Sequence, residues 1–208
     1  MQTIQPRLWL SEEPLVLASK SKARRAMLVN AGIPVEVIPS SVNEPFLQKR
    51  QGASSSASEV AVMLAKAKAT NVGDQYPSRL VLGSDQTLEL TGRTLTKVRS
   101  RADAKDRLTH LAGGHHYLHS AFCFVRDGKV LYEGVDSARI SIRPLSEDFV
   151  EAYLDLNGDD VLASVAVYKV EGMGLQMINH IEGDWFTIQG LPLARVIEFL
   201  QLERFLLS

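Results

Sequence analysis

Short apolar runs alternate with amphipathic stretches along most of this chain. Brief apolar runs that end at small, polar or proline residues predict buried strands at residues 15–17, 35–38 and 79–82. Apolar positions with helical spacing predict helices at residues 24–30, 58–71, 100–111, 146–157 and 192–207. This alternation of strands and helices predicts an α/β fold.

Two further pairs of runs predict hairpins. Residues 116–126 and 130–143 flank the dipeptide Asp127-Gly128, which is typical of tight hairpin turns, and residues 88–95 contain a smaller turn. Serines before the apolar spacing begins predict helix N-caps, namely Ser58 and Ser100. Because the elements do not follow a strict βαβ order, we expect a mixed, partly parallel twisted sheet flanked by helices.

The length of 208 residues suits one domain. We expect residues 1–13 to form a polar N-terminal arm with an exposed Trp9, and residues 14–208 to form a single domain. The serine-rich residues 51–58 predict a mobile loop. Residues 192–207 carry enough large apolar side chains to need cover on more than one face, which favours a homodimer; deep packing within its own domain is the alternative.

Charge and cysteine content narrow the function classes. The 23 Lys+Arg balance 24 Asp+Glu, so the chain has no general basic surface for nucleic acid. The one cysteine, Cys123, excludes an intrachain disulfide and favours a reducing compartment. No apolar run is long enough for a membrane helix, so we expect a cytoplasmic protein that binds neither membrane nor nucleic acid.

The first predicted strand leads into a turn suited to an anion. Ser19 and Ser21 follow the strand, and Arg24 and Arg25 stand where the helix begins. Free backbone N–H groups and the positive end of the helix dipole gather at such a turn. The pattern therefore predicts a phosphate site, against the plainer alternative of an arginine pair on a solvated helix turn.

Eight stretches resemble, in chain order, the motifs of the Maf family of nucleoside triphosphate pyrophosphatases. They are residues 17–25, 42–44, 64–69, 81–86, 95–97, 167–168, 171–172 and 181–192. The most specific are the first strand–turn–helix and the closing sequence IEGDWFTIQGLP. The resemblance implies a Maf/Ham1-like fold with a cleft between two lobes, a homodimer, and hydrolysis of a nucleoside triphosphate to monophosphate and pyrophosphate.

Asp85 is the expected catalytic residue. Gly83 would let the chain turn after the buried strand, so that the Asp85 carboxylate projects from the strand end. The resemblance matches Glu44 to the family's second acidic residue. Together, Asp85 and Glu44 would bind a divalent cation, Mg²⁺ or Mn²⁺, that offsets triphosphate charge and helps to activate water. Both residues have plainer alternatives, as a turn aspartate and a solvated loop glutamate.

The resemblance also implies the substrate-binding set Ser19, Arg24, Lys68, Lys97 and Glu171. Arginine and lysine suit phosphoryl oxygens that gain charge during cleavage. The family spacing selects Lys68, and we expect Lys66, two residues earlier on the same helix, to be a surface charge.

Some positions depart from the family pattern. Ser164 stands where the family usually has lysine, and Glu171 where it usually has glutamine. The first change removes positive charge from the predicted substrate region, and the second adds negative charge. They support an alternative function, a catalytically weakened nucleotide-binding regulator linked to cell division.

Other candidate residues have structural interpretations. On a strand, His115 and His119 would stand about 13 Å apart at ~3.3 Å per residue, too far to share a metal ion. Trp185 and Phe186 could stack on a nucleobase, but we expect them in a strand of the core. Asp184 is expected to hold a turn.

Overall fold

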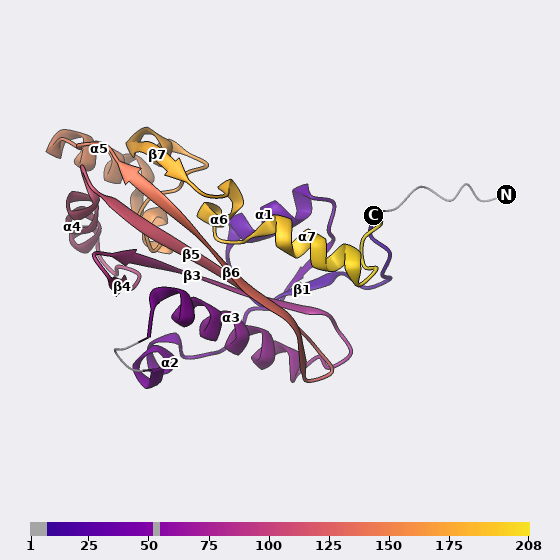
Figure 1. The fold of residues 1–208 in the computed structure, drawn as a ribbon. Helices are drawn as coiled ribbons and strands as arrows, with labels where there is room; N and C mark the ends of the chain where they lie inside the picture. Colours follow the sequence, from indigo (N-terminus) through magenta and orange to yellow (C-terminus); the bar gives the residue numbers. More distant parts are fainter. Residues whose placement is uncertain (1–7, 52–54) are drawn as a thin grey trace.

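The computed structural model describes residues 8–51 and 55–208, which form a seven-stranded sheet flanked by helices (Figure 1). The strands are β1 (Leu15–Leu17), β2 (Val35–Val37), β3 (Val81–Leu90), β4 (Arg93–Leu95), β5 (His115–Arg126), β6 (Lys129–Ile142) and β7 (Ile178–Glu182). The helices are α1 (Lys22–Asn30), α2 (Glu44–Gln51), α3 (Ala57–Gly73), α4 (Arg101–Leu111), α5 (Glu147–Asn157), α6 (Trp185–Gln189) and α7 (Leu193–Leu202). Two short 3₁₀ helices, η1 (Gly158–Ala163) and η2 (Met173–Met177), precede β7.

The sheet is mixed, as the sequence predicts. Its order is β2-β1-β3-β5-β6-β7, with β4 paired to the far end of β3. β1 is parallel to both β2 and β3, whereas all other pairs are antiparallel. β1 ends at Leu17, which pairs with Leu82 near the start of β3. The residues that follow β1 therefore lie beside the middle of β3.

Strand β3 differs from its prediction. The expected short strand and the first strand of the small hairpin are one continuous strand that pairs with β5 from Val81 to Glu89. Gly83 therefore lies inside a strand and makes no sharp turn. A Cβ at Gly83 would meet the carbonyl oxygen of Ala65 and would lie 2.6 Å from the backbone nitrogen of Ala69, so the glycine lets α3 approach β3 closely.

Serine caps begin several helices. Ser21, Ser100 and Ser146 accept hydrogen bonds at the first turns of α1, α4 and α5. The cap of α3 is Ser56, not the predicted Ser58, and Glu59 completes a capping box with it. Of the predicted mobile loop 51–58, Gln51 ends α2 and residues 52–54 lie outside the described residues.

The C-terminal region covers most of its apolar side chains within the chain. α7 ends at Leu202, short of the predicted Leu207, and the chain then turns back so that Leu206 pairs with Trp9. Trp9 is only 8% exposed and stacks on Phe205, so the expectation of an exposed tryptophan is wrong. The apolar side chains that favoured a dimer are therefore largely buried, although Leu207 is 57% exposed.

Helices on the two sides of the sheet enclose its core. Figure 1 shows α3 along one side of β3, β5 and β6, and α6 and α7 on the other. α4, α5 and the 3₁₀ helices pack at the end of the sheet away from α7, around a cluster that includes Leu108, Leu118 and Tyr168. None of the helices in the described ranges is long and apolar enough to cross a membrane.

Candidate functional site

Three charged side chains from three elements meet beside the end of β1. Asp85 comes from the middle of β3, Lys68 from α3 and Glu44 from the start of α2. The Nζ atom of Lys68 lies 2.5 Å from Oδ1 of Asp85 and 2.7 Å from Oε1 of Glu44. The side chains of Asp85 and Lys68 are each only 9% exposed. A buried lysine between two carboxylates is costly to desolvate, which favours a functional rather than a stabilising role.

Arg24 lies beside this cluster and is largely enclosed. Its Nε donates to the carbonyl of Gly190 at 2.8 Å, and its Nη1 donates to the carbonyl of Ser84 at 2.8 Å and to Oγ of Ser19 at 3.1 Å. Nη2 makes no hydrogen bond to the part of the chain that the structure describes. The guanidinium therefore ties the first turn, β3 and the closing segment together and keeps one nitrogen for another partner.

The neighbouring arginine has different surroundings. Arg25 is exposed on α1, whereas Arg24 is 8% exposed, so the two adjacent arginines separate into a solvated and a buried one. Ser21 caps α1, and Ser19 lies buried against Arg24. The structure thus brings Ser19 and Arg24 together with Asp85, Lys68 and Glu44.

Burial and neighbouring charge act on the acids in opposite senses. Burial raises the pKa of Asp85 above its usual value, although Lys68 and Arg24 oppose the rise. Burial is the largest single influence on Glu44 and favours a higher pKa, but the charge and hydrogen bond of Lys68, together with the charges of Lys97 and Arg24, bring that pKa below its usual value. Asp85 is therefore the better proton acceptor of the two, and Glu44 stays ionised to lower pH.

Lys97 follows β4, in the segment that leads to α4, and the charges of Glu44, Arg24, Lys68 and Asp85 act on its pKa. Burial lowers the pKa of Lys97, and the nearby Glu44 carboxylate raises it. Glu44, in turn, feels Lys97 as one of the charges that lower its own pKa. The structure therefore places Lys97 within electrostatic reach of the cluster, as the sequence predicts.

Glu171 is the one predicted site residue that the structure does not bring to the cluster. It is exposed in the segment between η1 and η2, where its charge adds a smaller contribution to the rise in the pKa of Tyr153 that burial causes. Among the described residues it makes no ion pair or hydrogen bond with Asp85, Lys68 or Arg24. Nearby, Lys169 pairs with Asp160 at 3.2 Å.

The two carboxylates suit a divalent cation that also binds phosphate. Oδ1 of Asp85 and Oε1 of Glu44 both contact the Nζ atom of Lys68, at 2.5 and 2.7 Å. The two carboxylate oxygens therefore lie near each other. Within the described ranges, no group of three His, Cys, Asp or Glu side chains could hold a metal ion. Mg²⁺ and Mn²⁺ accept few carboxylates when phosphate oxygens and water supply the remaining ligands, so two acids fit such an ion.

The histidines take structural partners. His119 contacts Oγ of Ser137 at 2.7 Å through Nδ1, and a carboxylate oxygen of Glu89 at 3.1 Å through Nε2. His116 is fully buried, with Nε2 2.8 Å from the hydroxyl oxygen of Tyr168.

Comparison with known proteins shows the family of this chain. The family model for Maf-like proteins matches residues 14–203. A nucleoside triphosphate pyrophosphatase of Nitrobacter winogradskyi is 46% identical over 94% of this chain and 96% of that protein. The chain belongs to the family of Maf-like proteins.

Other Maf-like relatives carry two kinds of name. A nucleoside triphosphate pyrophosphatase of Rhodopseudomonas palustris is 46% identical over 96% of this chain and 98% of that protein. A 7-methyl-GTP pyrophosphatase of Rhizobium etli is 44% identical over 88% of this chain and 92% of that protein.

The closing motif of this Maf-like chain forms a helix, not the predicted strand. Asp184 caps α6 by accepting from the backbone N–H of Thr187 at 2.8 Å, which confirms its structural role. Trp185 and Phe186 lie on this helix and are 39% and 37% exposed, so their expected place in the core is wrong. The spacing of Asp184 and Thr187 is the sequence signal for this cap.

Two residues of β3 hold the closing motif and were not predicted as site residues. Nε2 of Gln86 donates to the carbonyls of Thr187 and Ile188 at 3.1 and 3.0 Å. Oγ of Ser84 donates to the carbonyl of Gly190 at 3.1 Å. These partners are about 100 residues away in the chain, so no local pattern identifies them.

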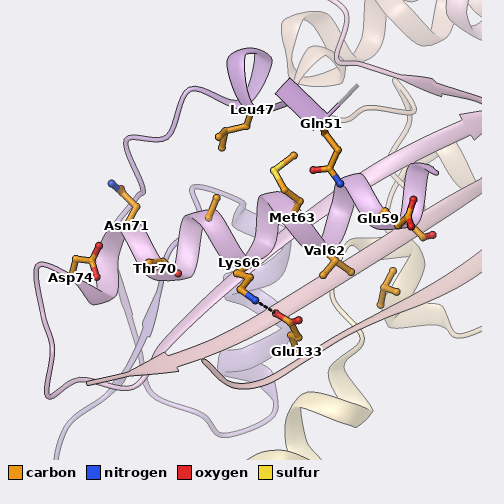
Figure 2. A pocket seen from close by; sticks show the side chains of 13 residues that line it. Leu47, Gln51, Glu59, Val62, Met63, Lys66, Thr70, Asn71, Asp74 and Glu133 are labelled. Carbon is orange, nitrogen blue, oxygen red and sulfur yellow. Dashed lines mark ion pairs between the residues drawn. The ribbon is translucent and has the colours of Figure 1, made fainter. Parts of the chain in front are cut away.

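A groove of about 810 Å³ lies elsewhere on α3 (Figure 2). Its lining includes Leu47 from α2, Met63 from α3 and the ion pair between Lys66 and Glu133, which are 3.4 Å apart. The groove does not contain Asp85, Lys68 or Arg24 in its lining, so it is separate from the charged cluster.

Proposed function

We propose that this chain hydrolyses a nucleoside triphosphate to nucleoside monophosphate and pyrophosphate. The observation that carries the proposal is the buried meeting of Asp85, Lys68 and Glu44 beside the turn that holds Ser19 and Arg24. This arrangement combines positive charge for a triphosphate with a carboxylate able to accept a proton. The names of the relatives supply the same reaction class.

In this proposal, Asp85 accepts a proton from the attacking water. The water oxygen bonds to one phosphorus atom of the α–β bridge, the bond between that phosphorus and the bridging oxygen breaks, and the bridging oxygen leaves with the other fragment, so that nucleoside monophosphate and pyrophosphate separate. Burial raises the pKa of Asp85, which makes it a stronger base than an ordinary aspartate. A bound divalent cation would offset the charge of the triphosphate and lower the pKa of water.

Lys68 has two successive partners in the proposed reaction, first the two carboxylates and then the triphosphate. Without nucleotide it neutralises Asp85 and Glu44, as the short contacts show. An incoming triphosphate offers Lys68 a stronger anionic partner, so the two carboxylates become free to hold the cation. Arg24 stabilises the phosphates through its remaining Nη2, and Lys97 adds charge from the β4 side.

Glu171 is not among the residues that we expect to contact the phosphates. We retain it only as a proposed contact for the base or sugar, since it is exposed and does not share the charges around Lys68. A Glu171→Gln substitution would then change the ranking of nucleotide bases without changing the reaction products.

A nucleotide panel tests the proposed reaction. Canonical and modified nucleoside triphosphates, 7-methyl-GTP included, are assayed for pyrophosphate release with Mg²⁺, with Mn²⁺ and with EDTA. We expect pyrophosphate from at least one nucleotide, and only with a divalent cation. Orthophosphate as the sole product, or equal rates in EDTA, would contradict the proposal. Tight nucleotide binding without turnover of any nucleotide would instead support the weakened regulator, which Ser164 and Glu171 favour.

We further propose a homodimer in the cytoplasm. The dimer now rests on the family resemblance, because the apolar side chains near the C-terminus are largely buried within the chain. The cytoplasmic location is supported by Cys123, which is free and buried. Light scattering distinguishes the assemblies, since a monomer has a mass of 22.9 kDa and a dimer twice that value.

A further inference from the structure

The segment that carries Lys97 has little structure of its own. β4 ends at Leu95 and α4 begins at Arg101, so residues 96–100 form no regular element. Lys97 is exposed over much of its surface, although the protein around its ammonium group partly desolvates it. Among the described residues no ion pair fixes that group. The position of this charge therefore depends on contacts that hold the backbone around it.

Arg107 supplies such a contact from α4. Its Nη2 donates to the carbonyl oxygen of Thr96, the residue before Lys97, at 3.1 Å. Of the side chains that the structure describes, this is the only one that hydrogen-bonds a carbonyl of residues 96–99. On the other side of Lys97, Val98 packs against the core. Lys97 is thus held between a hydrogen-bonded residue and a packed one.

The other end of the guanidinium is anchored in the core. Nη1 of Arg107 donates to the carbonyl of Val165 at 2.8 Å, and Val165 is only 5% exposed. Arg107 itself stands on α4, whose Ala104 and Leu108 are fully buried. Arg107 therefore joins a rigid part of the molecule to the irregular segment through two fixed nitrogens of one planar group.

The segment has space into which it could move. A groove of about 570 Å³ lies beside it, and its lining includes Thr96, Lys97 and Arg107. Without the contact to Thr96, the backbone around Lys97 would be free to shift along this groove. A shift of a flexible lysine away from a bound triphosphate weakens their attraction because that attraction falls with distance.

We propose that Arg107 is a positioning residue, which fixes Lys97 toward the triphosphate by bridging the carbonyls of Thr96 and Val165. The inference rests on the proposed function, because it assigns Lys97 to the substrate. Arg107 does not touch the substrate in this account, so its effect must pass through Lys97. That dependence makes the inference testable.

The first test compares two arginines of α4. Arg107→Met keeps most of the side-chain stem and removes both donors, whereas Arg101→Met removes exposed ion pairs with Glu151 and Asp155. We expect Arg107→Met to lower kcat/KM about tenfold, mainly by raising KM, since one charged contact to substrate is weakened. Arg101→Met is expected to change it less than twofold. Equal values for the two variants would overturn the inference.

The second test is a double-mutant cycle with Lys97→Ala. If Arg107 acts through Lys97, Arg107→Met changes kcat/KM less than twofold once Lys97 is alanine. A full tenfold loss in both backgrounds would show that Arg107 acts independently and would overturn the inference. Arg107→Lys, which keeps one donor but cannot span both carbonyls, serves the same comparison if the methionine variant does not fold.

A measurement without nucleotide separates this inference from the proposed function. Amide hydrogen exchange of residues 96–100 is expected to be faster in Arg107→Met than in the wild type, and unchanged in Arg101→Met. Absence of pyrophosphate release by the wild-type protein would contradict the proposed function. Unchanged exchange in Arg107→Met would contradict the positioning role, whatever the activity.

Discussion

Two lysines on α3 stand two residues apart and have opposite surroundings. Lys68 contacts Asp85 and Glu44 at 2.5 and 2.7 Å and has a side chain only 9% exposed. Lys66 pairs with Glu133 at 3.4 Å in the open groove of Figure 2, and its side chain is 50% exposed. The same residue type on the same helix thus serves a buried charge cluster on one face and a solvated ion pair on the other.

From this contrast we infer the site from the buried charges and not from the groove beside Lys66. A half-exposed ion pair such as that of Lys66 contributes little to stability, typically ~0–1 kcal/mol. A buried pair must overcome a desolvation cost of several kcal/mol per ion, so an apolar substitute would often be as stable. The cluster around Lys68 is therefore better explained by chemistry than by folding.

The largest effect is expected at the acid that contacts Lys68. Asp85→Asn keeps the size of the side chain but removes its basicity and its charge, so turnover should fall ~10²-fold or more. The matched change on the other face, Glu133→Gln, should leave turnover within about twofold. Steady-state rates and circular dichroism of both variants test this. Wild-type turnover in a folded Asp85→Asn variant would remove Asp85 from catalysis.

The two lysines themselves provide the next comparison. Lys68→Met should lower kcat/KM by more than about tenfold, because a buried charge that meets the phosphates is lost and two buried or half-buried carboxylates lose their partner. Lys66→Met should change kcat/KM less than about twofold. Similar losses in both variants would show that the two faces of α3 do not differ in function.

A smaller difference is expected between the two adjacent arginines of α1. Arg24→Ala should weaken triphosphate binding about tenfold and lower the free energy of unfolding by roughly 2–4 kcal/mol, because the buried carbonyl of Ser84 loses its side-chain donor and the carbonyl of Gly190 keeps only the Ser84 hydroxyl. Arg25→Ala should affect neither quantity measurably, since Arg25 is exposed. Nucleotide titration and urea unfolding separate the two effects. Equal loss of affinity in both variants would contradict the assignment of the phosphate contact to Arg24 alone.

The smallest expected effect concerns pH. Burial lowers the pKa of Lys97, so with rising pH this lysine loses its charge earlier than an ordinary lysine does. KM should therefore rise on the alkaline side, and Lys97→Arg should move that rise to higher pH, because arginine stays protonated. A pH profile of KM that is the same in wild type and Lys97→Arg would assign the alkaline change to another group.

The sequence predicts the local segments of this site better than it predicts how these segments come together in the fold. The strand–turn–helix around Ser19 follows from short-range spacing, and the preference for Lys68 over Lys66 follows from the resemblance to the family motif. The structure buries Lys68 and leaves Lys66 half exposed. The continuous β3 was not predicted, because its extent depends on pairing with residues of β5 that lie 28 to 44 positions away in the chain. Asp85 accordingly reaches the site from the middle of a strand and not from a turn.

Other errors have the same long-range origin. Arg24 donates to the carbonyl of Gly190, which is 166 residues away in the chain. The partial enclosure of the Arg24 side chain could therefore not be inferred from the first turn alone. Trp9 is buried by Phe205, near the opposite end of the chain. Glu171 was assigned by its place in a motif, and motif order does not show which side chains face one another.

The most direct test of the account is a crystal structure of the Asp85→Asn variant with a nucleoside triphosphate and Mg²⁺. We predict that the phosphate oxygens lie within hydrogen-bonding distance of Lys68 and of the turn between Ser19 and Arg24, with the cation on Glu44. A nucleotide bound in the groove between Lys66 and Leu47, with the turn at Ser19 left without phosphate, would contradict the account.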